Sequence, residues 1–238
     1  MMKKVIFPAL TFCVLTYTGL AQTKKGDKIV GVSFGSISYT NSKAQTTYSN
    51  TPTVYNSDGS SFSISVNPNV ALFVKDNLAI GGGVTMSFYT SKSNSSNTSS
   101  TTTSDNKSTQ PDIYIGPLAR YYFGGSSKGM PYVQANFQIG FSFGKSESKT
   151  STGASSETKT KPKGDWNAGI ALGYEHFVTP NIGLFGSIGF NYGKSVTEYE
   201  YRPSSGSGYD YKSSYSRFYI PVNLGIQVHI LGSNKLKK

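Results

Sequence analysis

Beyond its first 21 residues, this chain contains no cysteine and no long apolar run. Its one Cys among 238 residues is Cys13, inside an N-terminal apolar stretch, so disulfides, thiol catalysis and cysteine-based metal sites are not expected. No later stretch approaches the ~20 apolar residues that a membrane-crossing helix needs. Charged residues make up only 15% of the chain, whereas Gly (26), Tyr (17) and Phe (14) accompany many Ser, Thr and Asn residues. This composition disfavours helices and favours strands.

The first residues have the pattern of a secretory signal peptide over 1–21. Lys3 and Lys4 supply the positive charge, an apolar region follows, and Gly19-Leu20-Ala21 offers a small-x-small cleavage site. The apolar region is too short for a transmembrane helix. We therefore expect export of residues 22–238 as one domain, with an uncleaved anchor as the alternative.

Alternation of apolar and small polar residues predicts eight antiparallel strands. One parity of each strand carries Val, Ile, Leu and aromatic residues, and the other carries Gly, Ser, Asn, Gln and Thr. A three-residue turn joins the second strand to the third, which predicts a hairpin. The predicted strands cover roughly 28–39, 62–74, 78–88, 113–123, 133–143, 166–174, 184–192 and 218–230.

Short and long connections alternate between the predicted strands. The long connections are rich in Ser, Thr, Asn and Lys, have little to bury, and are expected to lack structure. Tight turns at one end and long loops at the other are typical of outer-membrane barrels, and such loops are unusual in compact soluble domains. The predicted long loops are 41–60, 90–110, 145–164 and 194–216.

The second face of the strands indicates which side points outward. A water-facing surface normally carries many charges, yet this face is almost free of mid-strand Lys and Glu. Small neutral polar residues fit the narrow interior of an eight-stranded ring, so the large apolar residues face lipid. The predicted fold is all-β, an eight-stranded antiparallel up-and-down transmembrane β-barrel, with a soluble sandwich and a lipocalin-like carrier as alternatives. Aromatic residues near strand ends predict interfacial girdles: Phe88, Tyr89, Tyr121, Tyr122, Phe123, Tyr132, Phe143, Trp166, Phe177, Tyr192, Phe218 and Tyr219.

These strands resemble a known family. Residues 115–123, with the short turn after them, and residues 170–174 resemble strands of small outer-membrane barrels of the OmpX and OmpA-transmembrane-domain type, and more closely the Bacteroidetes outer membrane β-barrel domain, including PorT-like members. The resemblance implies an outer-membrane location and insertion by the barrel assembly machinery. It also implies, as an alternative function, a role in assembling a secretion system. One departure is that the last strand ends at His229-Ile230-Leu231 and not on an aromatic residue.

Arg120 and Glu175 are the notable charges on the inward parity. Each lies about four residues before a short turn, so both are expected at one depth near the periplasmic mouth. We predict an interior ion pair, which the resemblance supports because OmpA-type barrels hold interior charge networks. A conductance gate and two residues without contact are the alternatives.

The two histidines suggest neither catalysis nor metal binding. His176 and His229 lie on opposite faces near one end, so they cannot share an ion, and no serine-histidine arrangement lies near the outer rim. Gly81-Gly82-Gly83 is an in-strand glycine cluster without the context of a phosphate loop. No enzyme activity, metal or cofactor is predicted.

The formal net charge of +11 raises the question of anionic partners. The charges are scattered, so nucleic acid is not expected. Lys159, Lys161 and Lys163 cluster in one predicted outer loop and are candidates for contact with lipopolysaccharide, against the alternative of loops that attract nothing specific. The expected partners are outer-membrane lipid, lipopolysaccharide and the barrel assembly machinery, with the protein as a monomer.

Three functions follow from this reading. The first is a structural or surface-interaction role with long outer loops and a closed or narrow lumen. The second is a narrow channel for ions or small solutes, although open pores need ~16 strands. The third and least favoured is a membrane enzyme.

Overall fold

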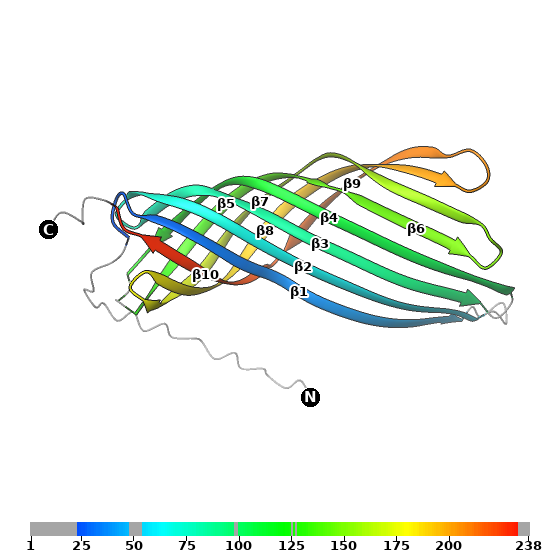
Figure 1. The fold of residues 1–238 in the computed structure, drawn as a ribbon, viewed down its shortest axis with the longest axis horizontal. Helices are drawn as coiled ribbons and strands as arrows, with labels where there is room; N and C mark the ends of the chain where they lie inside the picture. Colours follow the sequence, from blue (N-terminus) through cyan, green and yellow to red (C-terminus); the bar gives the residue numbers. More distant parts are fainter. Residues whose placement is uncertain (1–22, 48–53, 98–99, 125, 127, 233–238) are drawn as a thin grey trace, which may run out of the picture.

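The computed structural model describes residues 23–47, 54–97, 100–124, 126 and 128–232, so the predicted signal peptide lies outside the described residues. Among them, no helix has the length and hydropathy needed to span a bilayer. The strands pair antiparallel in one sheet (Figure 1). Their bounds are β1 Lys28–Thr47, β2 Val54–Lys75, β3 Leu78–Asn97, β4 Ser100–Tyr122, β5 Gly129–Ser142, β6 Gly144–Thr150, β7 Ser155–Thr179, β8 Ile182–Pro203, β9 Tyr209–Tyr219 and β10 Val222–Ile230.

The strand pairings close a ring in the order β1-β2-β3-β4-β5-β7-β8-β10 and back to β1. The remaining two segments pair outside this ring, β6 with β4 and β7, and β9 with β8. Lys28 pairs with Ile230, so the first strand begins and the last strand ends at the same end of the ring. The short links after β2 and β7 lie at that end, which we call the turn end (Figure 1).

The described part of the chain contains ten strand segments where the sequence predicts eight strands, because β6 and β9 lie largely in the predicted loops 145–164 and 194–216 and are separated by short breaks from β5 and β10. β5 and β6 are separated at Phe143, whose N–H donates to the carbonyl of Pro111 at 2.9 Å. β9 and β10 are separated at Ile220 and Pro221. Proline has no N–H to donate to a ladder, which explains a break at this point.

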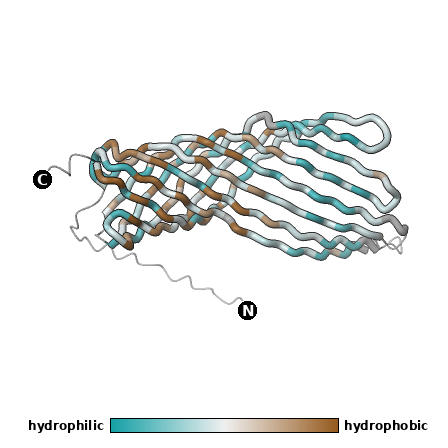
Figure 2. Tube along the Cα trace, viewed as in Figure 1, coloured by the Kyte–Doolittle hydropathy of each residue, from teal (hydrophilic) through white to brown (hydrophobic). Residues whose placement is uncertain are grey.

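The prediction of long structureless loops is wrong. The predicted loops at 41–60, 90–110, 145–164 and 194–216 are largely strand: β3 continues to Asn97, β4 starts at Ser100, and β6 pairs with β7 from Gly144 onward. The backbone groups of these Ser- and Thr-rich segments are satisfied by neighbouring strands, so they do not need a buried face to be ordered. Figure 2 shows the result, an apolar half at the turn end and a polar half that extends beyond it.

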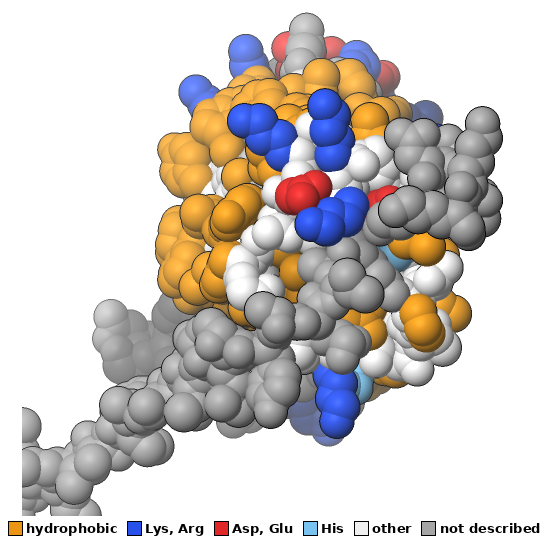
Figure 3. All heavy atoms as spheres, turned by 90° about the vertical axis from the view of Figure 1, so that its left-hand side faces the viewer, with side chains coloured by type: hydrophobic (Ala, Val, Ile, Leu, Met, Phe, Trp, Pro, Cys, Tyr) orange, Lys and Arg blue, Asp and Glu red, His pale blue; other side chains and the backbone are white. Residues whose placement is uncertain are grey.

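The predicted orientation of the side chains is confirmed. Outward residues of the apolar half are exposed, such as Leu172 at 60% and Leu224 at 65%, whereas inward Phe73 and Ala79 are at 1% and 0%. Viewed from the turn end, hydrophobic side chains gather around the rim of the molecule (Figure 3). We call this outward surface the apolar belt.

The predicted aromatic girdle is confirmed in part. Trp166 lies on the outer surface, with ring centroids 6.2 Å from Phe137 and 5.7 Å from Tyr192. Tyr122 and Tyr132, in contrast, are buried inside the ring at 0% and 1% exposure. Both occupy inward positions of their strands, which takes their rings away from the interface despite their place near a strand end.

Candidate functional site

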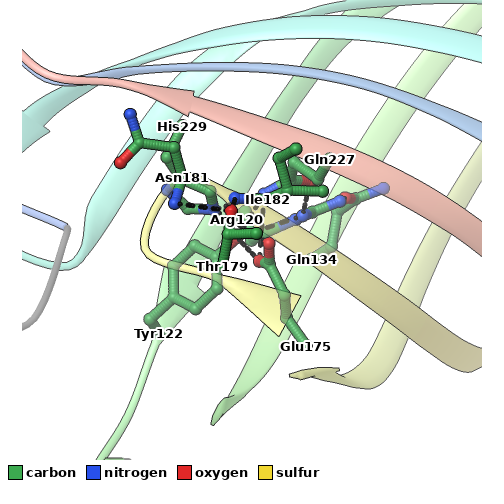
Figure 4. Close-up of polar contacts among 9 residues, drawn as sticks. All are labelled: Arg120, Tyr122, Gln134, Glu175, Thr179, Asn181, Ile182, Gln227 and His229. Carbon is green, nitrogen blue, oxygen red and sulfur yellow. Dashed lines mark hydrogen bonds and ion pairs between the residues drawn. The ribbon is translucent and has the colours of Figure 1, made fainter. Parts of the chain in front are cut away.

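The interior near the turn end holds a buried polar cluster, drawn in Figure 4. Strand alternation places its members inward: two from β4, one from β5, one from β7 and two from β10. Arg120 and Gln134 are register partners on neighbouring strands, which brings their side chains together. We call this set the interior cluster: Arg120, Tyr122, Gln134, Glu175, Gln227 and His229.

Arg120 is only 2% exposed, and all three nitrogens of its guanidinium donate hydrogen bonds within the protein. Its Nε and Nη2 donate to Oε1 of Gln134 at 2.9 and 2.7 Å. Its Nη1 donates to the hydroxyl of Tyr122 at 3.2 Å and to Oε1 of Gln227. The group also lies over the ring of Tyr132, 4.2 Å from the centroid. A buried charge is tolerated when its donors are satisfied in this way.

The carboxylate of Glu175, a residue that is 0% exposed, is the acceptor at the other side of the network. Oε2 accepts from Tyr122 Oη at 2.7 Å and from Gln227 Nε2 at 3.0 Å. Oε1 lies 2.8 Å from Nε2 of His229. The sequence predicts a direct pair between Arg120 and Glu175. The structure places both in one cluster, but among the described residues they are joined through Tyr122 and Gln227.

Sequence reasoning missed most members of this cluster. Gln227 and His229 occupy inward positions of the last strand, and His229 was expected at the same end, so the parity signal was present. Which inward residues meet across the lumen depends on ring closure, since Arg120 and Gln227 are 107 positions apart. Inward polar residues at one depth were the available clue.

Aromatic rings complete the filling of the interior at this end. Tyr122 lies 5.9 Å from Phe73 and 5.6 Å from Tyr132, centroid to centroid, and Tyr132 lies 6.4 Å from Phe185. All four side chains are at most 6% exposed. The interior cluster and these rings therefore form one packed layer across the ring.

Gly183 leaves the space that Glu175 occupies. A Cβ at this position would lie 2.0 Å from Oε1 and 2.6 Å from Cγ of Glu175. We expect Gly183→Ala to displace the carboxylate and lower the free energy of unfolding by roughly 1–3 kcal/mol. Unfolding in guanidinium would measure this. Gly82→Ala is the matched control, because its Cβ would meet nothing closer than the carbonyl of Gly116 at 3.5 Å; equal loss in both variants would contradict the expectation.

Beyond the packed layer the lumen opens into a cavity of about 1060 Å³. Small polar side chains line it, and several bond across the lumen, as Gln138 does to Thr85 at 3.1 Å. Farther from the turn end, the carboxylate of Asp165 accepts hydrogen bonds from the hydroxyl of Tyr114 at 3.2 Å, from Ser142 at 2.8 Å and from the N–H of Val196 at 3.1 Å. The cavity is thus a polar space that the packed layer closes toward the turn end.

The predicted lipopolysaccharide contacts lie on a strand and not in a loop. Lys159 and Lys161 belong to β7 and point to carboxylates, Lys159 to Glu157 at 3.0 Å and Lys161 to Glu200 at 3.1 Å and Asp210 at 3.2 Å. Hydrogen bonds to Glu200 and Asp210 raise the pKa of Lys161, and its ammonium in turn lowers the pKa of Asp210. The side chain of Lys163 lies outside the described residues. The positive charge of this patch is therefore offset by its neighbours.

The histidines lie as the alternation predicts, His229 buried at 0% and His176 on the exposed face. In the part of the chain that the structure describes, no group of three or more His, Cys, Asp or Glu side chains could hold a metal ion.

Comparison with known proteins identifies the family. A model of the "Outer membrane protein beta-barrel domain" matches residues 20–197. The chain belongs to this family. Its members are outer-membrane β-barrels, so this β-barrel protein is located in the cell outer membrane. The PorT-like relationship is not supported by a specific match.

Solved structures similar to this outer-membrane protein include OprG from Pseudomonas aeruginosa, with 14% identity, covering 89% of this chain and 99% of OprG, TM-score 0.49. Outer membrane protein AlkL in DMPC bilayers shows 14% identity over 97% of this chain and 98% of AlkL, TM-score 0.41. Ail of Yersinia pestis shows 12% identity over 87% of this chain and 99% of Ail, TM-score 0.32. No curated protein matches the chain.

Proposed function

We propose that the eight-membered strand ring spans the outer membrane and that the protein has a structural or surface-interaction role, without catalysis. The packed layer of the interior cluster and its aromatic neighbours carries this proposal. Buried Arg120, Tyr122 and Glu175 occupy the lumen at the turn end, so a continuous water path through the ring is not expected. The interior cluster acts in this proposal as a structural plug.

The polar half of the strands supports a role at the cell surface. The strands extend well beyond the apolar belt and carry ion pairs on their outer face, such as Lys145 with Glu157 at 2.8 Å (Figure 2). A large ordered sheet outside the membrane offers area for partners of the kind that lipopolysaccharide or another cell presents. Lys159, Lys161 and Lys163 stay candidates for anionic lipid contact within this surface.

A narrow channel is the second candidate, and the cavity of about 1060 Å³ favours it. Conduction would require the packed layer to move, since it closes the cavity toward the turn end. An assembly factor of a secretion system stays a proposal that rests on resemblance alone.

Planar-bilayer recording and vesicle swelling separate the two functions. We expect the protein, reconstituted in lipid, to give no more permeability than protein-free membranes. Arg120→Ala should raise permeability if the interior cluster acts as the plug. Steady conductance through the unmodified protein would contradict the closed-lumen role and favour the channel.

Shortening one hairpin tests the surface role. Lys145 and Lys159 are register partners, so residues 146–158 can be replaced by Asn-Gly, which joins paired strands through a tight turn. The membrane-embedded ring is untouched, and heat-modifiable migration on a gel checks that it folds. We expect weaker binding of cells to lipopolysaccharide-coated or host surfaces. If every surface phenotype persists, this hairpin does not carry the role.

A further inference from the structure

The wall of the ring is open on one side in the half away from the turn end, which we call the upper half. β1 pairs with β10 up to the pair Phe34–Leu224, and above it the described part of β1 pairs with β2 alone. On the other side β9 pairs with β8 and forms the edge of the sheet. Figure 1 shows β9 and the upper part of β1 diverging on opposite sides of the molecule. We call the space between them the slot.

Two local features turn the strands apart at the same level. The register of β1 against β2 shifts between Phe34 and Ile37, and such a bulge bends its strand. On the other side, Pro221 interrupts the chain between β9 and β10. Both irregularities adjoin the last closed pair, Phe34–Leu224. The opening is therefore encoded on both of its sides.

The slot joins the lumen to the apolar belt. The cavity is lined from both sides of the slot, by Phe34 and Ile37 of β1 and by Ile220 and Val222 near the break. Unpaired backbone at membrane depth is tolerated where it borders a water-filled cavity, and this cavity meets that need. The outward side chains are apolar and exposed: Phe34 45%, Ile37 64%, Tyr39 70%, Phe218 65%, Ile220 54%, Val222 58% and Leu224 65%.

The depth of the slot corresponds to one leaflet. From Arg217 to Leu224 the chain advances about 23 Å at ~3.3 Å per residue. A strand tilt of ~40° reduces this to roughly 18 Å along the membrane normal, a little more than half of the ~30 Å hydrocarbon core. The slot thus runs from the outer interface to the middle of the membrane, which is the space of one outer-leaflet acyl chain.

A cation lies at the upper end of the slot. Arg217 is exposed and lines the cavity, with its guanidinium 5.1 Å from the ring centroid of Tyr219. Among the described residues it has no hydrogen bond or ion pair; Asp112 is within electrostatic range but accepts from Gln110 at 3.2 Å. The guanidinium of Arg217 can therefore bind the anionic headgroup of a lipid-like ligand while the acyl chain of that ligand enters the slot.

We propose that the slot between β1 and β9 binds an anionic single-chain amphiphile taken from the outer leaflet. Its acyl chain lies along Ile220 and Val222, continuous with the lipid-facing belt, and its headgroup meets Arg217 inside the mouth of the cavity. This inference rests on the membrane-spanning arrangement proposed above and adds a ligand site to it.

Photo-labelling of the full exported chain tests the proposal. The protein is reconstituted in phosphatidylcholine nanodiscs with diazirine-bearing palmitate, irradiated and mapped by peptide mass spectrometry. We expect labels to concentrate on residues 34–39 and 218–224, roughly tenfold above residues 113–123 on the far side of the ring. Equal labelling around the belt by a folded, inserted protein would overturn the slot while leaving the structural role intact.

Two variants and one probe separate binding from mere lipid contact. Arg217→Gln, and equally the fatty alcohol in place of palmitate, should reduce slot labelling roughly tenfold. Arg202→Gln, an exposed arginine paired with Glu200 at 2.8 Å, is the matched control and should change nothing. Ile220→Trp fills the slot without changing its charge and should also reduce labelling. If Arg217→Gln does not fold, Ile220→Trp alone decides the test. Unchanged labelling of either folded slot variant would contradict the proposal.

Discussion

Glu175→Leu is expected to lower the free energy of unfolding by roughly 3–5 kcal/mol, because it leaves the buried charge of Arg120 without the carboxylate that balances it. Tyr122 and Gln227 lose an acceptor, and Nε2 of His229 loses its partner at 2.8 Å. Guanidinium unfolding of the protein in lipid vesicles measures the loss. A much smaller loss would show that the interior cluster does not stabilise the fold.

A double variant shows where the cost originates. Arg120→Met combined with Glu175→Leu removes both buried charges, so its loss should be smaller than the sum of the two single losses. The exposed pair of Lys145 and Glu147, 2.8 Å apart, supplies the control. Glu147→Gln should leave the unfolding midpoint unchanged, since exposed pairs contribute little. Additive losses in the double variant would mean that the two charges act independently.

Ile170→Arg is expected to prevent most of the protein from inserting. Ile170 lies outward near the middle of the belt segment of β7 and is 52% exposed. Arginine on the lipid face of a barrel costs ~2–4 kcal/mol at the midplane and much less near the interfaces. The folded fraction, read from heat-modifiable migration and from outer-membrane fractionation, should fall sharply.

Ser214→Arg is the matched control for this prediction. Ser214 has the same outward parity but lies on β9 above the belt, where it pairs with Val196. The same charge at this position meets water, so insertion should proceed as in the unmodified protein. Equal insertion of both arginine variants would show that the apolar belt does not face lipid.

The inward and outward faces of the strands could be read from the sequence with little ambiguity. Where one face is apolar, a slip of one residue would expose the whole apolar set, so the alternation specifies register strongly. Ile115 and Leu172 lie outward and Tyr114 and Leu118 inward, as predicted. The same alternation placed Arg120 and Glu175 in the interior.

The polar half could not be read in the same way. Around Ser93 and Ser104 both faces of the strand meet water, so hydropathy shows no period of two and the segments look like loops. Their order comes from pairing with neighbours, as Ser95 pairs with Ser104. A ladder of backbone hydrogen bonds has no sequence signature when neither face is buried.

The sequence by itself determined that this chain forms antiparallel strands with apolar side chains on the outer face and polar side chains on the inner face, because strand alternation acts locally on every second residue. The tertiary structure alone decided that His229 and Gln227 complete the site around Glu175, that Tyr122 links it to Arg120, and that the wall stays open beside Pro221. These contacts depend on ring closure between the first and last strands, which joins residues far apart in the chain and leaves no local pattern.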